Sequence, residues 1–162
     1  MISKHLIAGF IFGISMSFIS WIVGMIINTI LAKTEYYKKI SNFSFIKSET
    51  INKNIGIKYF KWIVKNTFFK FFNQKIKVEN KKTDLTEIRH EMTLSEISHL
   101  IGFVFVSFFA VYQCFNQNFV FGLTMMIPNI LMNFFPSLLQ QENKRRIDKL
   151  ISRQIKTVAN KA

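Results

Sequence analysis

The chain has 162 residues, enough for one domain, and 49 % of them are apolar, including 19 phenylalanines. Its net charge of +13 arises from 22 Lys and Arg against 9 Asp and Glu. Because the apolar residues form long uncharged runs, this charge favours an anionic membrane surface over nucleic acid as the partner. The single cysteine, Cys114, lies inside an apolar run, which excludes a disulfide framework and a CxxC metal site.

The first apolar run, Leu6 to Leu31, contains no ionisable residue. As a helix it would be about 39 Å long, enough to cross a hydrocarbon core of about 30 Å. It is too long for a cleaved signal sequence and no cleavage site follows, so it predicts a retained anchor. Gly9, Gly13 and Ser17 recur every four residues and predict a stripe on which another helix packs closely.

The central segment, residues 32–98, is basic and rich in aromatic residues. From Lys58 to Lys77 lysines alternate with bulky apolar residues, and Lys58, Lys61 and Lys65 have helical spacing. This pattern predicts a basic amphipathic helix in the lipid headgroup layer. Binding of single-stranded nucleic acid is the rival interpretation, but no known motif supports it, so nucleic acid is not an expected partner.

Two further apolar runs, Leu100–Phe115 and Phe119–Leu139, are separated by the polar turn 116–118. Together they predict a helical hairpin over residues 99–140. The first of these runs would be only about 24 Å long as a helix, so full crossing and a re-entrant hairpin both remain open. Pro128 and Pro136 are expected to kink or interrupt the last helix.

The predicted fold is therefore an all-α membrane protein with about three transmembrane helices, a C-terminal hairpin and an interfacial basic helix. We treat 1–162 as one integral-membrane domain, made of the span 6–31, the interfacial segment 32–98, the hairpin 99–140 and the basic tail 141–162. One Lys precedes the first span, fourteen Lys and Arg follow it, and seven follow the third. Positively charged loops stay in the cytoplasm, which predicts an outside N-terminus and a cytoplasmic C-terminus in a bacterial inner membrane.

A polar string at the start of the hairpin contains Glu96 and, three residues later, His99. These two share a helical face, and a carboxylate beside an imidazole suits a general base. Thr93 and Glu96 also fit a capping box, in which Thr93 is the N-cap and Glu96 only closes the helix start. Both interpretations remain open here.

A metal site is an alternative use of the same string, through His90, Glu91, Glu96 and His99. His90-Glu91 begins like HExxH, but Leu94 stands where that zinc motif needs its second histidine. We therefore expect no metal.

Polar residues also recur along the last helix at spacings of four and three, which predicts one continuous stripe. Its members are Asn129, Asn133, Pro136, Gln140, Asn143 and Arg146. Because the two helices of a hairpin are antiparallel, we expect the end of this stripe to lie beside Glu96 and His99. Helix-to-helix hydrogen bonding of the two asparagines alone is the simpler alternative.

The spacing of these residues resembles a known family, the glycosyl-diaponeurosporenoate acyltransferases of staphyloxanthin-type carotenoid synthesis. That family has a Glu-x4-Glu-x2-His string, matched here by Glu91, Glu96 and His99. Its later Asn, Gln, Asn and Arg are matched by Asn133, Gln140, Asn143 and Arg146, with Lys144 in place of one Arg.

The resemblance is found mainly over residues 87–150, while the first 85 residues match only in layout. Leu94-Ser95 and Gln141-Glu142 replace the family's Arg-Ala and Arg-Tyr, and a nearby proline is displaced by one position.

The resemblance implies a membrane acyltransferase that moves a fatty acyl group to a hydroxyl of a lipid-soluble acceptor, with or without a sugar. His99 and Glu96 would be catalytic, and the substrate would be bound by Glu91, Asn133, Gln140, Asn143 and Arg146. No cofactor is expected beyond an acyl thioester donor, and the partners would be membrane lipids and the acceptor. The alternative is a non-catalytic membrane subunit whose polar residues bind other membrane proteins.

Overall fold

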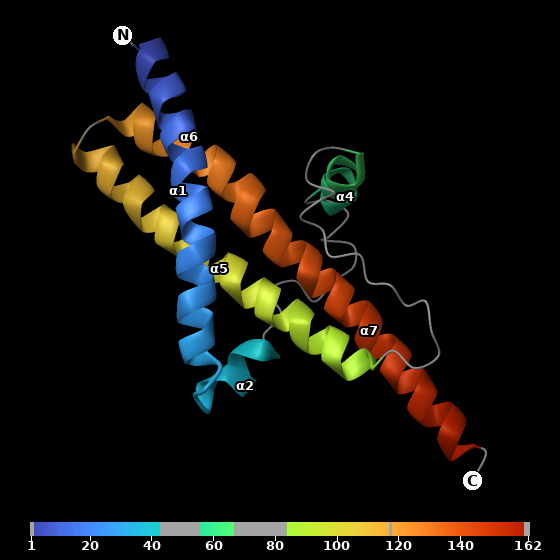
Figure 1. Cartoon of the computed structure of the whole chain (residues 1–162). Helices are drawn as coiled ribbons and strands as arrows, with labels where there is room; N and C mark the ends of the chain where they lie inside the picture. The colour runs from blue at the N-terminus through green and yellow to red at the C-terminus, as the bar shows by residue number, and fades with distance from the viewer. Residues whose placement is uncertain (1, 43–55, 67–83, 117, 161–162) are drawn as a thin grey trace. The chain divides into compact units, whose positions relative to one another are not determined.

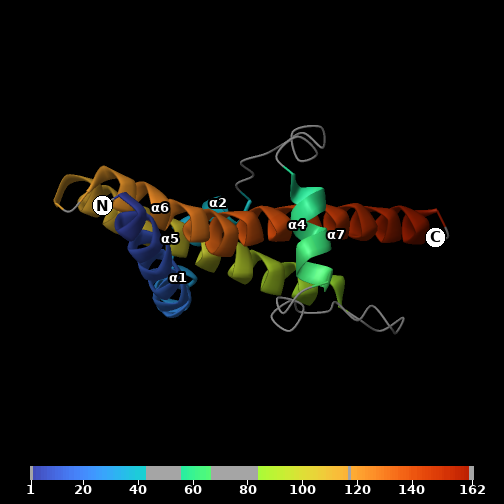
Figure 2. The same ribbon diagram turned by 90° about the horizontal axis from the view of Figure 1, so that it is seen from above.

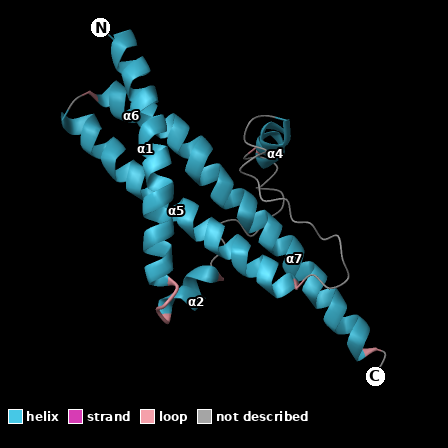
Figure 3. Ribbon diagram, viewed as in Figure 1, coloured by secondary structure: helices cyan, strands magenta, loops and turns pink. Residues whose placement is uncertain are grey.

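A computed structural model describes residues 2–42, 56–66, 84–116 and 118–160, and these parts are helical with short turns and no strand (Figures 1 and 3). Their helices are α1 (Ile2–Leu31), α2 (Tyr36–Ser41), α4 (Ile57–Asn66), α5 (Leu85–Asn116), α6 (Phe119–Asn129), the π-helix η2 (Ile130–Phe134) and α7 (Phe135–Ala159).

Three stretches of the described chain are long and apolar enough to cross a membrane: Ile2–Leu31, Leu85–Asn116 and Phe119–Thr157. This confirms the all-α membrane fold. At 32 residues, α5 is about 48 Å long, so the second apolar run is part of a helix with ample length to cross. The helix extends well upstream of Leu100 because Leu85, Ile88 and Met92 continue an apolar face that packs against Ile147.

The chain divides into two compact units, and each is described separately. Unit 1 contains residues Met1–Phe43 and Leu94–Ser137, and unit 2 contains Ser44–Thr93 and Leu138–Ala162.

In unit 1, α1 crosses the antiparallel pair formed by α5 and α6 (Figure 1). The crossing is close because small residues line α1, as its Gly9, Gly13 and Ser17 predicted. A Cβ atom on Gly13 would lie only 2.6 Å from Pro128 Cγ and 2.8 Å from the Met125 carbonyl oxygen. The stripe continues with Ser20, Gly24 and Asn28, all buried, and the opposite side of α1 exposes large apolar side chains suited to lipid.

The core of unit 1 lies at this crossing. Met16 of α1, Val106 and Ala110 of α5 and Met125 of α6 are buried together, with phenylalanines packed around them. Asn118, the last residue of the predicted polar turn, caps α6 by accepting a 2.8 Å hydrogen bond from the Val120 amide.

Unit 2 contains the first part of α5, most of α7 and α4, whose axis runs across that of α7 (Figure 2). In α4, Lys61 donates to Glu142 of α7 at 2.6 Å. Tyr59 and Trp62 are largely exposed on α4. The rest of the predicted basic helix, residues 67–77, lies outside the described residues.

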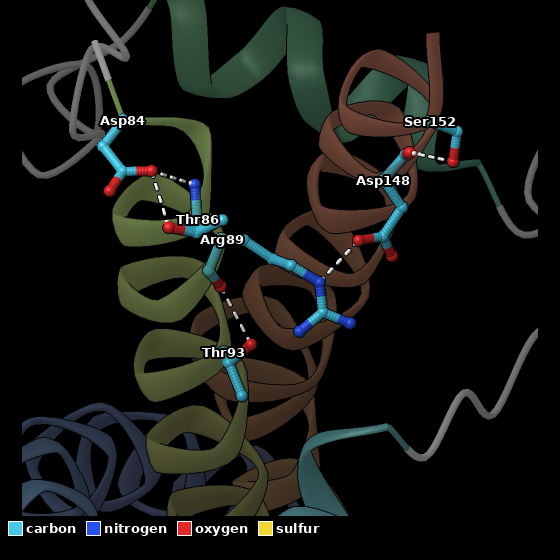
Figure 4. A network of polar contacts seen from close by, with 6 residues as sticks. All are labelled: Asp84, Thr86, Arg89, Thr93, Asp148 and Ser152. Carbon is cyan, nitrogen blue, oxygen red and sulfur yellow. Dashed lines mark hydrogen bonds and ion pairs between the residues drawn. The ribbon is translucent and has the colours of Figure 1, made fainter. Parts of the chain in front are cut away.

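The alternative interpretation of Thr93 and Glu96 as a capping box is wrong. The helix begins at Leu85, where Asp84 accepts hydrogen bonds from the Thr86 amide at 2.8 Å and the Thr86 hydroxyl at 2.6 Å (Figure 4). These hydrogen bonds lower the pKa of Asp84, because they favour its charged form. Thr93 lies inside the helix and donates to the Arg89 carbonyl, while the Arg89 side chain pairs with Asp148 of α7.

Candidate functional site

Two asparagines on consecutive turns form the centre of the polar cluster in unit 1. Asn129 donates its amide hydrogens to the Phe103 carbonyl and the Ser107 hydroxyl, each at 3.1 Å. Asn133 in turn donates to Asn129 Oδ1 and to Ser20 Oγ, each at 3.0 Å. Both asparagines are fully buried, so these hydrogen bonds join α1, α5 and α6–η2 away from water.

This network fixes which way each amide points. A backbone carbonyl can only accept, so the Asn129 atom facing Phe103 must be the nitrogen. Asn129 Oδ1 is then the acceptor for Asn133, and the amide hydrogens of Asn133 are both used. The remaining Asn133 atom, Oδ1, is a buried acceptor that finds no hydrogen-bond partner among the described residues.

His99 of α5 is the ring that Asn133 faces. The Asn133 side chain interacts with the imidazole, and a Cβ atom on Gly102, one turn further along α5, would lie 2.9 Å from Asn133 Oδ1. Neither Asn133 Oδ1 nor His99 Nδ1 has a partner of hydrogen-bonding geometry within the described chain. Asn133 Oδ1 and unprotonated His99 Nδ1 are both acceptors, so neither can satisfy the other without an added proton.

Trp21 of α1 bounds the imidazole on another side, edge-on at 6.2 Å between ring centroids. Its indole N–H donates to the Met132 carbonyl at 3.3 Å. In an α-helix that carbonyl would accept from residue 136, but residue 136 is a proline and has no N–H. Pro136 thus leaves Met132 able to accept the hydrogen bond that holds Trp21 beside His99.

Glu96 occupies a second polar cluster of unit 1, one turn before His99. It is only 3 % exposed. Its charge acts on the Tyr37 phenol of α2. Burial is the main cause that raises the pKa of Tyr37, with a smaller contribution from Glu96, so the phenol stays neutral. Nearby, Asn28 donates to the Leu94 carbonyl at 2.8 Å and to the Ser98 hydroxyl at 2.9 Å.

The other predicted site residues belong to unit 2. Glu91 is exposed on α5, while Gln140 and Asn143 are partly exposed on α7. Arg146 donates to Glu142 at 2.8 Å, and Glu142 also accepts from Lys61. The Arg146 side chain is 65 % exposed, so its guanidinium retains room for an anionic group.

The predicted stripe along the last helix has the wrong register beyond Asn133. In η2 the Phe135 amide donates to the Ile130 carbonyl, five residues back, which inserts one extra residue into the helical repeat. Beyond it the buried polar residues are Ser137, Gln141 and Lys144, whereas Pro136, Gln140 and Asn143 are only partly buried.

Sequence reasoning therefore missed Ser137, Gln141, Trp21, Asn28 and Tyr37. The two prolines were the available signal for the register change, since they remove the helical donors to residues 124 and 132. As for a metal, no three His, Cys, Asp or Glu side chains gather to bind one in the parts of the chain that the structure describes.

Comparison with known proteins decides the family. The model of the glycosyl-4,4'-diaponeurosporenoate acyltransferase family matches residues 33–153. The chain belongs to this family. The match begins far upstream of residue 87, so the resemblance extends over α2, α4 and the segments beside them. No curated protein and no solved structure matches the chain.

The glycosyl-4,4'-diaponeurosporenoate acyltransferase match contains every site residue predicted from the sequence and also Tyr37, but not α1. Three helices able to span a membrane and an acyltransferase family together describe a membrane acyltransferase-like protein.

Proposed function

We propose that this protein transfers a fatty acyl group from a thioester to a hydroxyl of a lipid-soluble acceptor that carries a sugar. The acceptor class follows the name of the family. The observation that carries the proposal is the pair formed by His99 and Asn133, a buried amide acceptor facing an imidazole whose Nδ1 lacks a partner in the described chain.

In the proposed reaction, the acceptor oxygen attacks the thioester carbonyl while His99 removes the hydroxyl proton. His99 takes this proton on Nδ1, the ring nitrogen without a hydrogen-bond partner in the described chain, while Nε2 carries the ring proton beforehand; Asn133 Oδ1 can then accept a hydrogen bond from the imidazolium. The C–S bond then breaks, the acyl ester forms, and the imidazolium returns its proton to the thiolate. Glu96, three residues away on the same helix and buried, favours the imidazolium electrostatically.

A non-catalytic membrane subunit is the competing function. The hydrogen bonds of Asn129 and Asn133 join three helices, and packing alone would account for them. Packing alone does not account for the unpartnered polar atoms of Asn133 and His99, because a buried unpaired polar atom costs stability. A bound substrate hydroxyl would supply the proton donor that these two acceptors lack, which favours the enzyme.

A direct assay tests the proposal. The purified protein in lipid nanodiscs, supplied with palmitoyl thioester and dodecyl glucoside, should form palmitoyl dodecyl glucoside and release free thiol in equal amounts. Empty nanodiscs and permethylated dodecyl glucoside, which has no hydroxyl, are the controls. Thiol release that is equal with both glucosides would mean thioester hydrolysis and would contradict acyl transfer to the acceptor.

The proposed site belongs on the cytoplasmic side of a bacterial inner membrane, because the basic residues lie after α1 and after the hairpin. In a Cys114→Ser background, a cysteine placed at Asn116 should react with an impermeant maleimide added outside cells. Cysteines at Lys39 and Lys156 should react only after the membrane is opened. Labelling of Lys39 and Lys156 from opposite sides would contradict this topology.

A further inference from the structure

The hydroxyl of Ser137 has a feature that distinguishes it from most hydroxyls in this protein. Most serine and threonine side chains of the described helices donate to a carbonyl of the preceding turn. They include Ser15, Ser17, Ser20, Thr29, Thr93, Ser107, Thr124, Ser152 and Thr157. Ser137 is 1 % exposed, yet its Oγ has no partner among the described residues. A buried hydroxyl in this state is short of one hydrogen bond.

The π-helix brings Ser137 onto the face of the two asparagines. In a regular α-helix, at about 100° per residue, a residue eight positions after Asn129 would be turned by about 80° from it. The π turn adds one residue without adding rotation, which reduces that offset to about 20°. Asn129, Asn133 and Ser137 therefore follow one line, and all three are buried.

Because this line runs antiparallel to α5, later residues of the last helix contact earlier residues of α5. Asn129 contacts Phe103 and Ser107, and Asn133 contacts Gly102 and His99. By the same step of about four residues, Ser137 is expected opposite residues 95–98 of α5, in the turn next to His99. Within unit 1, Ser137 Oγ, Asn133 Oδ1 and His99 Nδ1 are three buried polar atoms on neighbouring helical turns, each without a hydrogen-bond partner in the described chain.

We propose that these three atoms form a seat for the acceptor's hydroxyl group, in which Ser137 donates a hydrogen bond to the acceptor oxygen. Asn133 and His99 can accept the hydroxyl proton, while Ser137 supplies the donor that the oxygen needs. An alcohol can donate its one proton to an acceptor of the seat and accept a hydrogen bond from Ser137 through its lone pairs. A methyl ether has no proton to donate, so it should not bind there. The proposal rests on the proposed function for the role of His99, and it adds Ser137 as an acceptor-binding residue.

The test compares Ser137→Ala with two matched controls in lipid nanodiscs. Ser17→Ala removes a buried hydroxyl that donates to Gly13, and Ser15→Ala removes an exposed one that donates to Ile11. Loss of an unpaired hydroxyl should leave the melting temperature of Ser137→Ala equal to or above that of the parent. The KM for dodecyl glucoside should rise about tenfold, the effect of one lost hydrogen bond, with the KM for palmitoyl thioester unchanged.

Binding without turnover separates this proposal from the proposed function. Dodecyl glucoside should raise the melting temperature of the parent and of both control variants. It should raise the melting temperature of Ser137→Ala by a smaller amount. Permethylated dodecyl glucoside should raise the melting temperature of none of these proteins. If the parent protein binds the glucoside in this way but transfers no acyl group, the seat stands and the proposed function fails. Equal stabilisation of Ser137→Ala and the parent, a KM change for the thioester instead, or a lower melting temperature of Ser137→Ala would each overturn the seat.

Discussion

His99→Ala should reduce the rate of acyl transfer by about 10²- to 10⁴-fold, the usual contribution of a general base. The protein should remain folded, because the Nδ1 atom of His99 makes no hydrogen bond in the described structure. The edge-on contact with Trp21 is lost, at a cost of about 1 kcal/mol. Initial rates with palmitoyl thioester and dodecyl glucoside, together with thermal unfolding of the same sample, measure both effects.

His90→Ala is the matched control, since His90 lies on the same helix and is exposed; it should retain full activity. Glu96→Gln tests the electrostatic part of the mechanism, because it keeps the side-chain volume and removes the charge. Its rate should fall less than that of His99→Ala. Unchanged transfer by His99→Ala, or loss of a co-purifying membrane protein in place of lost activity, would favour the non-catalytic subunit.

Gly13→Val should have the largest effect on stability. A Cβ atom at this position would lie 2.6 Å from Pro128 and 2.8 Å from the backbone of Met125, so α1 must move away from α6. Overpacking of this kind costs about 1–3 kcal/mol. Because α1 also carries Ser20 and Trp21, which contact Asn133 and His99, the rate of acyl transfer should fall as well.

Ala8→Val provides the comparison for this variant, since Ala8 is exposed on the same helix and its substitution adds the same kind of side chain. Thermal unfolding in nanodiscs should show a lower melting temperature for Gly13→Val and little change for Ala8→Val. Equal melting temperatures for the two variants would mean that α1 does not pack on α6 through its small residues.

Some features of this protein follow from the sequence because they depend on local composition. The three membrane-spanning helices follow from uncharged apolar runs, since a backbone in lipid must satisfy its own hydrogen bonds. The glycines of α1 predicted close packing, because a small side chain permits it whatever the partner helix is. Glu91, Glu96 and His99 indicated the family through their spacing, which needs no three-dimensional information.

Other features depended on contacts between residues far apart in the chain. Thr93 and Glu96 fit a local capping pattern, but the apolar face of Leu85, Ile88 and Met92 packs against Ile147 and extends the helix past that point. Packing of an apolar face contributes more than one cap can, so the tertiary contact decided where α5 begins.

The sequence by itself determined the helices, their family and the presence of a polar face on the last one. Only the tertiary structure decided which residues share that face beyond Asn133, because one π turn shifts every later position by a residue. It also decided the neighbours of His99, since Trp21, Asn133 and Ser20 meet only where α1 crosses the hairpin. Hydrogen bonds between distant segments carry no periodic signal in the sequence, and they are what aligns this site.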